Sequence, residues 1–302
     1  MKMQSLKGLI AAVLLLTGTP ALAALNIFAC VPEWAALAKE LGGDKVSIYQ
    51  ASTALQDPHR VEARPSLVAR MRSADLAICT GADLEVGWLP VLQQTAGNRR
   101  TLPGQPGFIA AAELVDRLEV PERLDRADGD VHPAGNPHVH LDPRNIARIA
   151  DVITARLGQI DNANAAYYST RGKDFQARWR IAIARWESDA ALLRGMKVVA
   201  YHKGLTYLFH WLGIVEVANL EPKPGVPPNA GYLATLVGQL KSSPAEATVR
   251  AAYNDPKAVD WLHDKTGIPR VDLAYTVGGT TEARDLFSLF DDSIARLKGA
   301  RK

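Results

Sequence analysis

The residues from Asn164 to Arg194 read NAAYYSTRGKDFQARWRIAIARWESDAALLR, and this stretch decides how the chain is organised. Apolar side chains recur in it at steps of three and four, at Phe175, Trp179, Ile183, Trp186, Ala190 and Leu193. That spacing puts them on one face of an α-helix, so the stretch predicts a single amphipathic helix of about eight turns. A continuous helix is a stiff rod, whereas a linker rich in glycine and serine would let flanking domains swing.

Short apolar runs lie on both sides of this helix and alternate with helical patterns. The runs that read as buried strands are Leu25–Cys30, Val46–Gln50, Asp75–Thr80, Lys197–Tyr201, Ile214–Ala218, Thr248–Ala252 and Arg270–Ala274. Strands that alternate with helices are typical of βα units and parallel sheets. We therefore predict an α/β protein with two parallel-sheet lobes, residues 24–163 and 195–302, joined by one long rigid helix, residues 164–194.

The composition is that of a globular protein without a strong net charge. Of the 302 residues, 47% are apolar and 22% are charged, and 35 basic residues stand against 32 acidic ones. This balance gives no general attraction to a polyanion, so we expect no nucleic-acid partner. Two cysteines are too few for a disulfide-framework miniprotein or a cysteine-based zinc ribbon. Any metal in this protein must therefore be held by histidine, aspartate or glutamate.

The N-terminus reads as a secretory signal peptide over residues 1–23. Lys2 and Lys7 precede an apolar run, Leu9–Leu16, and Ala21-Leu22-Ala23 is a small-x-small cleavage pattern. The run is much shorter than the roughly 20 apolar residues that cross a bilayer, and no later stretch approaches that length. We expect an exported, periplasmic protein.

Export would place the two cysteines in an oxidising compartment, where they can pair. Cys30 and Cys79 each end a short apolar run, Leu25–Cys30 and Asp75–Cys79, that reads as a buried strand, and neighbouring strands would bring them within reach of one another. Two separate buried thiols are an equally acceptable interpretation, because the order of the strands is not visible in the sequence.

Three of the seven histidines fall within nine residues of one loop that is rich in glycine and proline: His132, His138 and His140. His132 is most simply interpreted as a loop residue. Asp142, followed by Pro143, reads as the N-cap of the next helix, with proline at its first position.

Two more histidines follow predicted strands. His59 lies in the loop after the strand that ends at Gln50, and His202 comes directly after the strand Lys197–Tyr201. Ligands of open parallel sheets bind beyond the carboxyl ends of the strands, so both histidines occupy positions that suit a binding site.

Several short motifs carry a family resemblance. They are Gln56-Asp-Pro-His59, Gly81-Ala-Asp-Leu-Glu85 with Trp88-Leu89, Asn136-Pro-His-Val-His-Leu-Asp-Pro143, Tyr201-His-Lys203 and Leu220-Glu-Pro-Lys-Pro224. Together with the position of the long helix, they resemble the solute-binding proteins of zinc and manganese ABC importers. The resemblance implies two α/β lobes, a metal in the cleft between them, and delivery to a membrane permease, with a metallochaperone as a second candidate partner. It also implies a monomer that is not an enzyme.

Carried over residue by residue, the resemblance places metal ligands at His59, His138 and His202. The fourth position departs from the family pattern. Asp272 is the nearest carboxylate in the strand-end region of the second lobe, but its neighbours lack the usual Asp-Pro. His140 follows His138 by two residues in a segment expected to be extended, so its side chain would point to the same side. Solvent is the third candidate.

The ligand types also predict which metal is bound. Imidazole suits zinc, copper, iron and nickel, whereas manganese sites depend on carboxylate and water. Three or four histidines therefore favour Zn²⁺ over Mn²⁺ as the transported ion. Four protein ligands make a closed tetrahedral site, which holds metal without activating water.

The segment from Asp125 to His132 is short, whereas many relatives carry a long histidine-rich loop at this place, so we expect the segment to capture metal only weakly.

Other functions stay open at this point. His138-Val-His-Leu-Asp142 fits a His-x-His-x-Asp pattern that resembles motifs of metallo-β-lactamases and amidohydrolases, which predicts a secreted zinc-dependent hydrolase as the alternative. Metallo-β-lactamases, however, continue with histidine where this chain has Pro143. A binding protein for an organic solute has the same architecture but leaves the histidines unexplained. A metal-dependent adhesin is not separable from an importer component by sequence.

Overall fold

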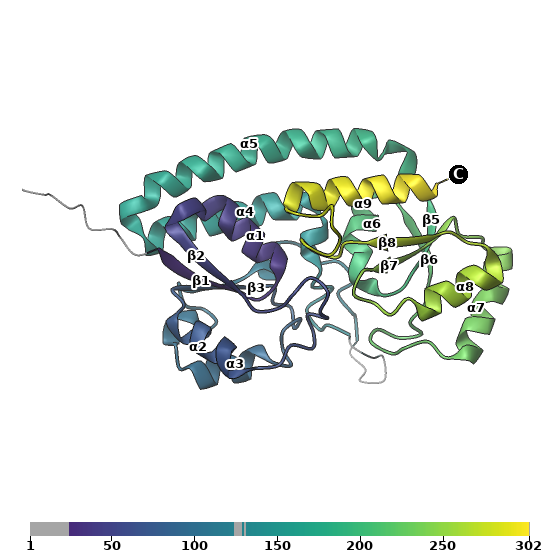
Figure 1. Cartoon of the computed structure of the whole chain (residues 1–302), viewed down its shortest axis with the longest axis horizontal. Helices are drawn as coiled ribbons and strands as arrows, with labels where there is room; N and C mark the ends of the chain where they lie inside the picture. The colour runs from purple at the N-terminus through teal and green to yellow at the C-terminus, as the bar shows by residue number, and fades with distance from the viewer. Residues whose placement is uncertain (1–23, 124–128, 130, 302) are drawn as a thin grey trace, which may run out of the picture.

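Two four-stranded parallel sheets, each flanked by helices, form the two lobes of the protein, which Figure 1 shows side by side. The computed structural model describes residues 24–123, 129 and 131–301. The predicted signal peptide, residues 1–23, and most of the segment from Asp125 to His132 lie outside the described residues. The predicted α/β fold with two parallel-sheet lobes is confirmed.

The first lobe holds a sheet of order β2-β1-β3-β4. Its strands are β1 (Leu25–Ala29), β2 (Val46–Gln50), β3 (Leu76–Cys79) and β4 (Phe108–Ala110), and its helices are α1 (Pro32–Gly42), α2 (Pro65–Ser73), α3 (Leu89–Ala96) and α4 (Pro143–Ile160). Three of these strands agree with the predicted ones, whereas β4 was not predicted, because a strand of three residues is too short to show a pattern. Asp142 caps α4 as expected, since its side chain accepts the backbone N–H of Arg144 at 2.9 Å.

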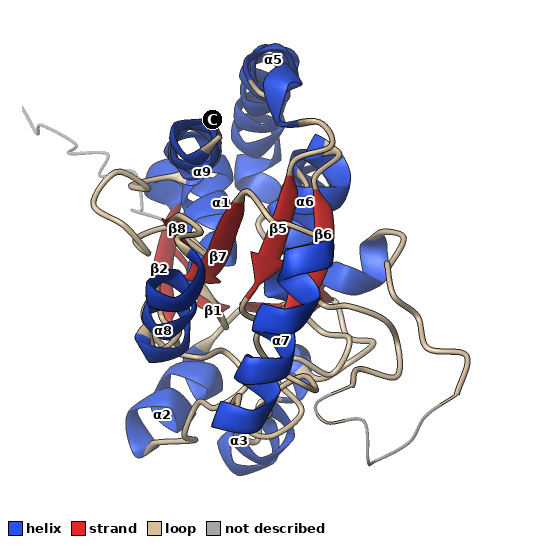
Figure 2. Cartoon of the chain, turned by 90° about the vertical axis from the view of Figure 1, so that its right-hand side faces the viewer, coloured by secondary structure: helices blue, strands red, loops and turns tan. Residues whose placement is uncertain are grey.

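The second lobe repeats the arrangement, with a sheet of order β6-β5-β7-β8. Its strands are β5 (Lys197–Ala200), β6 (Val215–Asn219), β7 (Ala247–Ala251) and β8 (Arg270–Leu273), and its helices are α6 (Thr206–Leu212), α7 (Ala230–Ser242), α8 (Lys257–Thr266) and α9 (Leu286–Ala300). All four strands lie within one residue of the predicted bounds at each end. Figure 2 looks onto this lobe and shows its strands between helices on the two sides.

The long helix, α5 (Ala165–Asp189), runs along the top of both lobes in Figure 1. It ends five residues before the predicted boundary at Arg194, because the chain turns at Ala190 and continues as a 3₁₀ turn. The buried indole of Trp179 donates to the carbonyl of Pro143 at 2.7 Å, which fixes α5 to the first lobe. The indole of Trp186 donates to Asp291 at 2.6 Å, which fixes it to α9.

The aromatic face of α5 packs directly onto α9. The ring centroids of Trp179 and Phe287 lie 4.8 Å apart, and those of Trp186 and Phe290 lie 4.9 Å apart. The buried apolar side chains around them belong to one continuous cluster that includes strand residues of both sheets. The lobes therefore share a core under α5, and the division at residues 163 and 194 stays a prediction.

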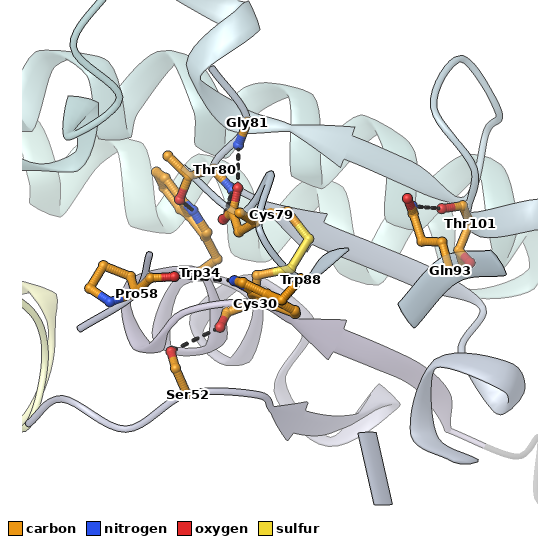
Figure 3. Close-up of a disulfide and its surroundings, with 11 residues drawn as sticks. Cys30, Trp34, Ser52, Pro58, Cys79, Thr80, Gly81, Trp88, Gln93 and Thr101 are labelled. Atoms are coloured by element: carbon orange, nitrogen blue, oxygen red, sulfur yellow. Dashed lines mark hydrogen bonds between the residues drawn. A yellow bond between two sulfur atoms is a disulfide. The ribbon is translucent and has the colours of Figure 1, made fainter. Parts of the chain in front are cut away.

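A disulfide joins the carboxyl ends of β1 and β3, which are neighbours in the first sheet. Cys30 and Cys79 have Cα atoms 4.8 Å apart, and Figure 3 shows the bond among the side chains around it. Two nearby hydrogen bonds hold the segment that follows β2. Ser52 donates its hydroxyl to the Cys30 carbonyl at 2.9 Å, and Trp88 donates its indole N–H to the Pro58 carbonyl at 3.2 Å.

None of the helices among residues 24–123, 129 and 131–301 combines the length and the apolar character that crossing a membrane requires.

Candidate metal centre

Four histidines meet where the carboxyl ends of the two sheets face each other. His59 comes from the loop after β2, His202 follows β5, and His132 and His138 come from the loop that precedes α4. The ring centroids of His59 and His138 lie 5.6 Å apart, those of His138 and His202 5.8 Å, and those of His59 and His202 6.1 Å. The structure thus brings the three predicted ligands together, while their binding of a metal stays a prediction.

Carboxylates orient two of these imidazoles. Nδ1 of His59 lies 2.8 Å from Oδ1 of Asp57, and Nδ1 of His202 lies 2.7 Å from Oε2 of Glu221. A carboxylate anion only accepts hydrogen bonds, so Nδ1 carries the proton and Nε2 keeps a lone pair in each neutral ring. Burial tends to raise the pKa of Asp57, but its hydrogen bonds with His59 outweigh this and hold the pKa below its ordinary value. Asp57 is therefore an anion at neutral pH.

His138 is the most buried of the three, with 1% of its surface exposed. Burial and the nearby imidazoles of His59 and His202 hold its pKa well below the ordinary value, so the ring is neutral at pH 7. Its Nδ1 is in short contact with the hydroxyl of Tyr275, and its backbone N–H donates to Asn136 at 3.0 Å. A neutral ring whose Nδ1–H donates to the tyrosine oxygen presents a bare Nε2 to a metal ion.

His132 also belongs to the cluster, although its place in the sequence favoured a simple loop residue. Its Nε2 lies 3.2 Å from Nε2 of His59, and the two rings stack with centroids 5.3 Å apart. One nitrogen from each of His59, His132 and His138 falls in a group whose members lie within 4.8 Å of one another. The position of His132 in the same loop as His138 was the sequence signal that could have added it to the candidate metal ligands.

The structure does not bring His140 to this cluster. The expectation of an extended segment was wrong: residues Val139–Leu141 form a 3₁₀ turn, which directs His138 and His140 to different sides. Nε2 of His140 lies 2.9 Å from the Tyr275 carbonyl, and its Nδ1 lies 3.2 Å from Oε1 of buried Glu33. Both ring nitrogens of His140 thus face protein groups of the buried interface between the lobes.

The same turn separates the members of the His-x-His-x-Asp pattern. Asp142, the last of them, accepts both the backbone and the guanidinium of Arg144 instead of facing His138. The three side chains of the pattern therefore do not converge on one point, as a hydrolytic zinc site would require.

Asp272 is likewise held elsewhere. Its Oδ2 accepts Nη2 of Arg250 on the neighbouring strand β7 at 2.6 Å, and its side chain is 44% exposed. The residue that the end of β8 contributes to the histidine cluster is Tyr275, three positions further along the chain. No sequence signal marked Tyr275, whereas Asp57 and Glu221 stand inside two of the motifs that carried the resemblance.

Ion pairs link the lobes at the rim of the cluster. Nζ of Lys203 lies 3.1 Å from Glu119 of the first lobe and 2.6 Å from Glu216 of β6. Glu119 also accepts the side-chain amide of Asn136 at 2.9 Å. Lys203 is therefore neutralised by protein carboxylates, which disfavours it as the receptor of an anionic organic solute. A cavity of about 200 Å³ opens beside these residues and is lined by His132, His138 and His202 among others.

Comparison with known proteins gives a consistent family. Residues 27–300 match the family model described as ZnuA, zinc-uptake complex component A, periplasmic. The high-affinity zinc uptake system protein ZnuA of Bacillus subtilis is 24% identical over 248 residues, which cover 81% of this chain and 72% of that protein. The manganese ABC transporter substrate-binding lipoprotein scaA of Streptococcus gordonii is 28% identical over 154 residues, or 50% of this chain and 46% of that protein.

The fold agrees with the sequence comparison. A crystal structure of ZnuA superposes with a TM-score of 0.78 at 20% identity, and the match covers 92% of this chain and 100% of that one. These relatives are extracytoplasmic solute-binding proteins, which confirms the expectation that the chain is not an enzyme. Because the match extends over residues 27–300, the protein belongs to the ZnuA family, the metal-binding substrate-binding components of ABC transporters.

Proposed function

We propose that this protein captures Zn²⁺ in the periplasm and delivers it to the membrane permease of an ABC importer, with His59, His138 and His202 as ligands. Residues 1–23 would direct export and be removed. A metallochaperone that loads the protein is compatible with this role, and the protein would act as a monomer.

The observation that carries the proposal is the orientation of the three imidazoles. Each has its Nδ1 in contact with an oxygen of Asp57, Tyr275 or Glu221. Such partners fix the ring and its tautomer and increase its basicity, which is how proteins prepare histidine to bind a metal. Rings that only filled a core would not need an oxygen partner on all three Nδ1 atoms, which leaves each Nε2 available to a metal.

Zinc is proposed over manganese on the chemistry of these ligands. Neutral imidazoles suit Zn²⁺, whereas Mn²⁺ prefers carboxylate and water. The two carboxylates nearest the cluster, Asp57 and Glu221, contact Nδ1 atoms, which places them behind the rings. There they balance the charge of a divalent ion without acting as ligands. One relative is named for zinc uptake and another for manganese, so titration with both ions tests this preference.

Capture would close the cleft by a small movement. His59 and His138 belong to the first lobe, whereas His202, Glu221 and Tyr275 belong to the second. A metal bound by both sets stabilises the closed arrangement, which the permease could recognise. We propose residues 24–163 and 195–302 as the moving lobes and residues 164–194 as the stiff connection. The core that the lobes share under α5 favours a small displacement over a wide hinge opening.

Isothermal titration of the metal-stripped mature protein with Zn²⁺ and with Mn²⁺ tests the proposal. We expect one tight zinc site, weaker manganese binding, and no hydrolysis of β-lactam or ester substrates by the zinc form. His138→Ala should abolish tight zinc binding. His210→Ala is the matched control, since His210 is exposed on α6 and outside the cluster. Absence of a tight zinc site, or equal loss in both variants, would refute the proposal.

A further inference from the structure

We propose that His132 is the fourth protein ligand, so that the metal is held by four imidazoles and the site selects Zn²⁺ against Mn²⁺. This inference rests on the proposed function and assigns the one ligand that the family resemblance left open. His132 thus takes the fourth ligand position, for which the sequence had suggested Asp272, His140 or solvent.

The spacing of two nitrogen atoms supports this assignment. Zn–N bonds of roughly 2.0–2.1 Å that meet at a tetrahedral angle place two ligand nitrogens about 3.3 Å apart. Nε2 of His132 lies 3.2 Å from Nε2 of His59, which matches that separation. Because Nδ1 of His59 faces Asp57, its Nε2 is the ligand atom, and it is this same atom that Nε2 of His132 approaches.

His132 also faces the ligand that lies deepest in the cluster. Its ring is edge-on to that of His138 with centroids 6.3 Å apart, and the two belong to the same group of candidate ligand atoms. His202 stands outside that group, with its ring centroid 5.8 Å from that of His138, and a small closing movement of the lobes would add it as the fourth imidazole. Four is the coordination number that closed zinc sites adopt.

The local backbone explains how a loop residue reaches this position. The backbone N–H of Gly135 donates to the carbonyl of His132 at 3.0 Å, which closes a turn directly after it. Before it, Gly129 has φ of +86°, and a Cβ there would lie only 2.3 Å from the carbonyl oxygen of Pro224. The loop of the first lobe therefore lies against the β6–α7 connection of the second. His132 is presented at the contact between the lobes, beside residues of both.

An all-imidazole site has a consequence for selectivity. With water or a carboxylate in the fourth position, the site would keep an oxygen ligand, which Mn²⁺ favours. Four imidazoles leave no oxygen in the ligand set, and nitrogen ligands bind Zn²⁺ more tightly than Mn²⁺. His132 would thus act as the residue that determines specificity, while His59, His138 and His202 supply the basic affinity.

Cadmium NMR can count the ligands directly. The mature protein would be labelled with ¹⁵N-histidine and loaded with ¹¹³Cd²⁺, a spin-½ substitute for Zn²⁺. Scalar coupling between ¹¹³Cd and Nε2 then identifies each bound imidazole. We expect four coupled histidines in the wild type and three in His132→Ala, with zinc affinity reduced at least about tenfold in the variant. His132→Glu should narrow the preference for Zn²⁺ over Mn²⁺, and His210→Ala should change neither result.

The outcomes separate this inference from the proposed function. Three coupled histidines in the wild type, with unchanged zinc affinity in His132→Ala and lost affinity in His138→Ala, would overturn the role of His132 alone. Tight zinc binding that survives His138→Ala would overturn the proposed function itself. A reduced affinity of His132→Ala with three coupled histidines already in the wild type would show that His132 only supports His59 through contact, and would also refute its role as a ligand.

Discussion

The hydroxyl of Tyr275, two residues beyond the end of β8 in the second lobe, contacts Nδ1 of His138 in the first lobe. The backbone carbonyl of the same tyrosine accepts a hydrogen bond from Nε2 of His140 at 2.9 Å. Burial raises the pKa of Tyr275 well above its ordinary value, so it stays a neutral hydroxyl. One residue of the second lobe therefore both orients a proposed ligand and joins the lobes beneath the site.

Tyr275→Phe should weaken zinc binding while leaving the ligand set unchanged. The variant removes the oxygen that holds the tautomer and orientation of His138, and loss of such a partner costs about 10- to 100-fold in metal affinity. Tyr232→Phe is the matched control. The hydroxyl of Tyr232 likewise has a hydrogen-bond partner, since it donates to the backbone carbonyl of Asn219 at 2.7 Å, but Tyr232 lies on α7 of the second lobe, away from the histidines. Equal zinc dissociation constants for both variants in competition titrations would contradict the role of Tyr275.

The metal-free protein should lose stability below pH 6.5 through His138. Burial, followed by the neighbouring imidazoles, holds its folded-state pKa well below 6.5, whereas in the unfolded chain the residue takes up a proton near that pH. Protons therefore bind preferentially to the unfolded state as the pH falls, and the free energy of unfolding decreases by up to about 1.4 kcal/mol per pH unit. Above pH 6.5 the imidazole of His138 is neutral in both the folded and the unfolded protein, so it no longer makes the free energy of unfolding depend on pH.

His138→Gln removes this titration and should flatten the dependence. Urea unfolding of the metal-free wild type and variant at half-unit steps between pH 7.5 and 5 measures the difference. The two curves of unfolding free energy against pH should run parallel above pH 6.5 and converge or cross below it. Curves that stay parallel over the whole range would show that His138 does not contribute.

Asp272→Ala should leave zinc affinity unchanged and lower stability modestly. The carboxylate pairs with Arg250, whose side chain is 11% exposed and also donates to the carbonyl of Asn254. Removing a partly exposed partner of this guanidinium should cost about 1 kcal/mol in the free energy of unfolding. Zinc titration and urea unfolding of the same preparation test both statements. A loss of zinc affinity without a loss of stability would restore Asp272 as a ligand.

Local patterns were sufficient for most of the fold. The steps of three and four from Phe175 onward predicted α5, and runs of apolar residues predicted seven of the eight strands in the described residues. Strand positions then placed His59 and His202 at the carboxyl ends of the sheets, where the structure has them. Such features depend on residues close in sequence, which is why one sequence was enough to find them.

Contacts between distant residues account for what the sequence did not predict. The turn at His140 depends on partners 107 and 135 residues away, Glu33 and Tyr275. The place of Tyr275 beside His138 depends on how the lobes pack, and that of His132 on the contact between Gly129 and the β6–α7 connection. No periodicity or spacing carries this information.

The disulfide is expected to stabilise the first lobe and the loop that presents His59. Cys30 and Cys79 are 49 residues apart, and closing a loop of this length in the unfolded chain corresponds to about 4 kcal/mol in the chain-entropy account. The double variant Cys30→Ala/Cys79→Ala, which leaves no free thiol in the sequence, should therefore unfold at a clearly lower guanidinium concentration. Wild-type protein unfolded with a reductant present should approach the variant's midpoint, since both lack the cross-link.

Zinc should raise the unfolding midpoint of the double cysteine variant as well, because a ligand that binds the folded state stabilises it by mass action. Coincident unfolding curves of oxidised wild type and variant would show that the bond contributes nothing to stability. A variant that folds but no longer responds to zinc would show that the disulfide is needed to position His59.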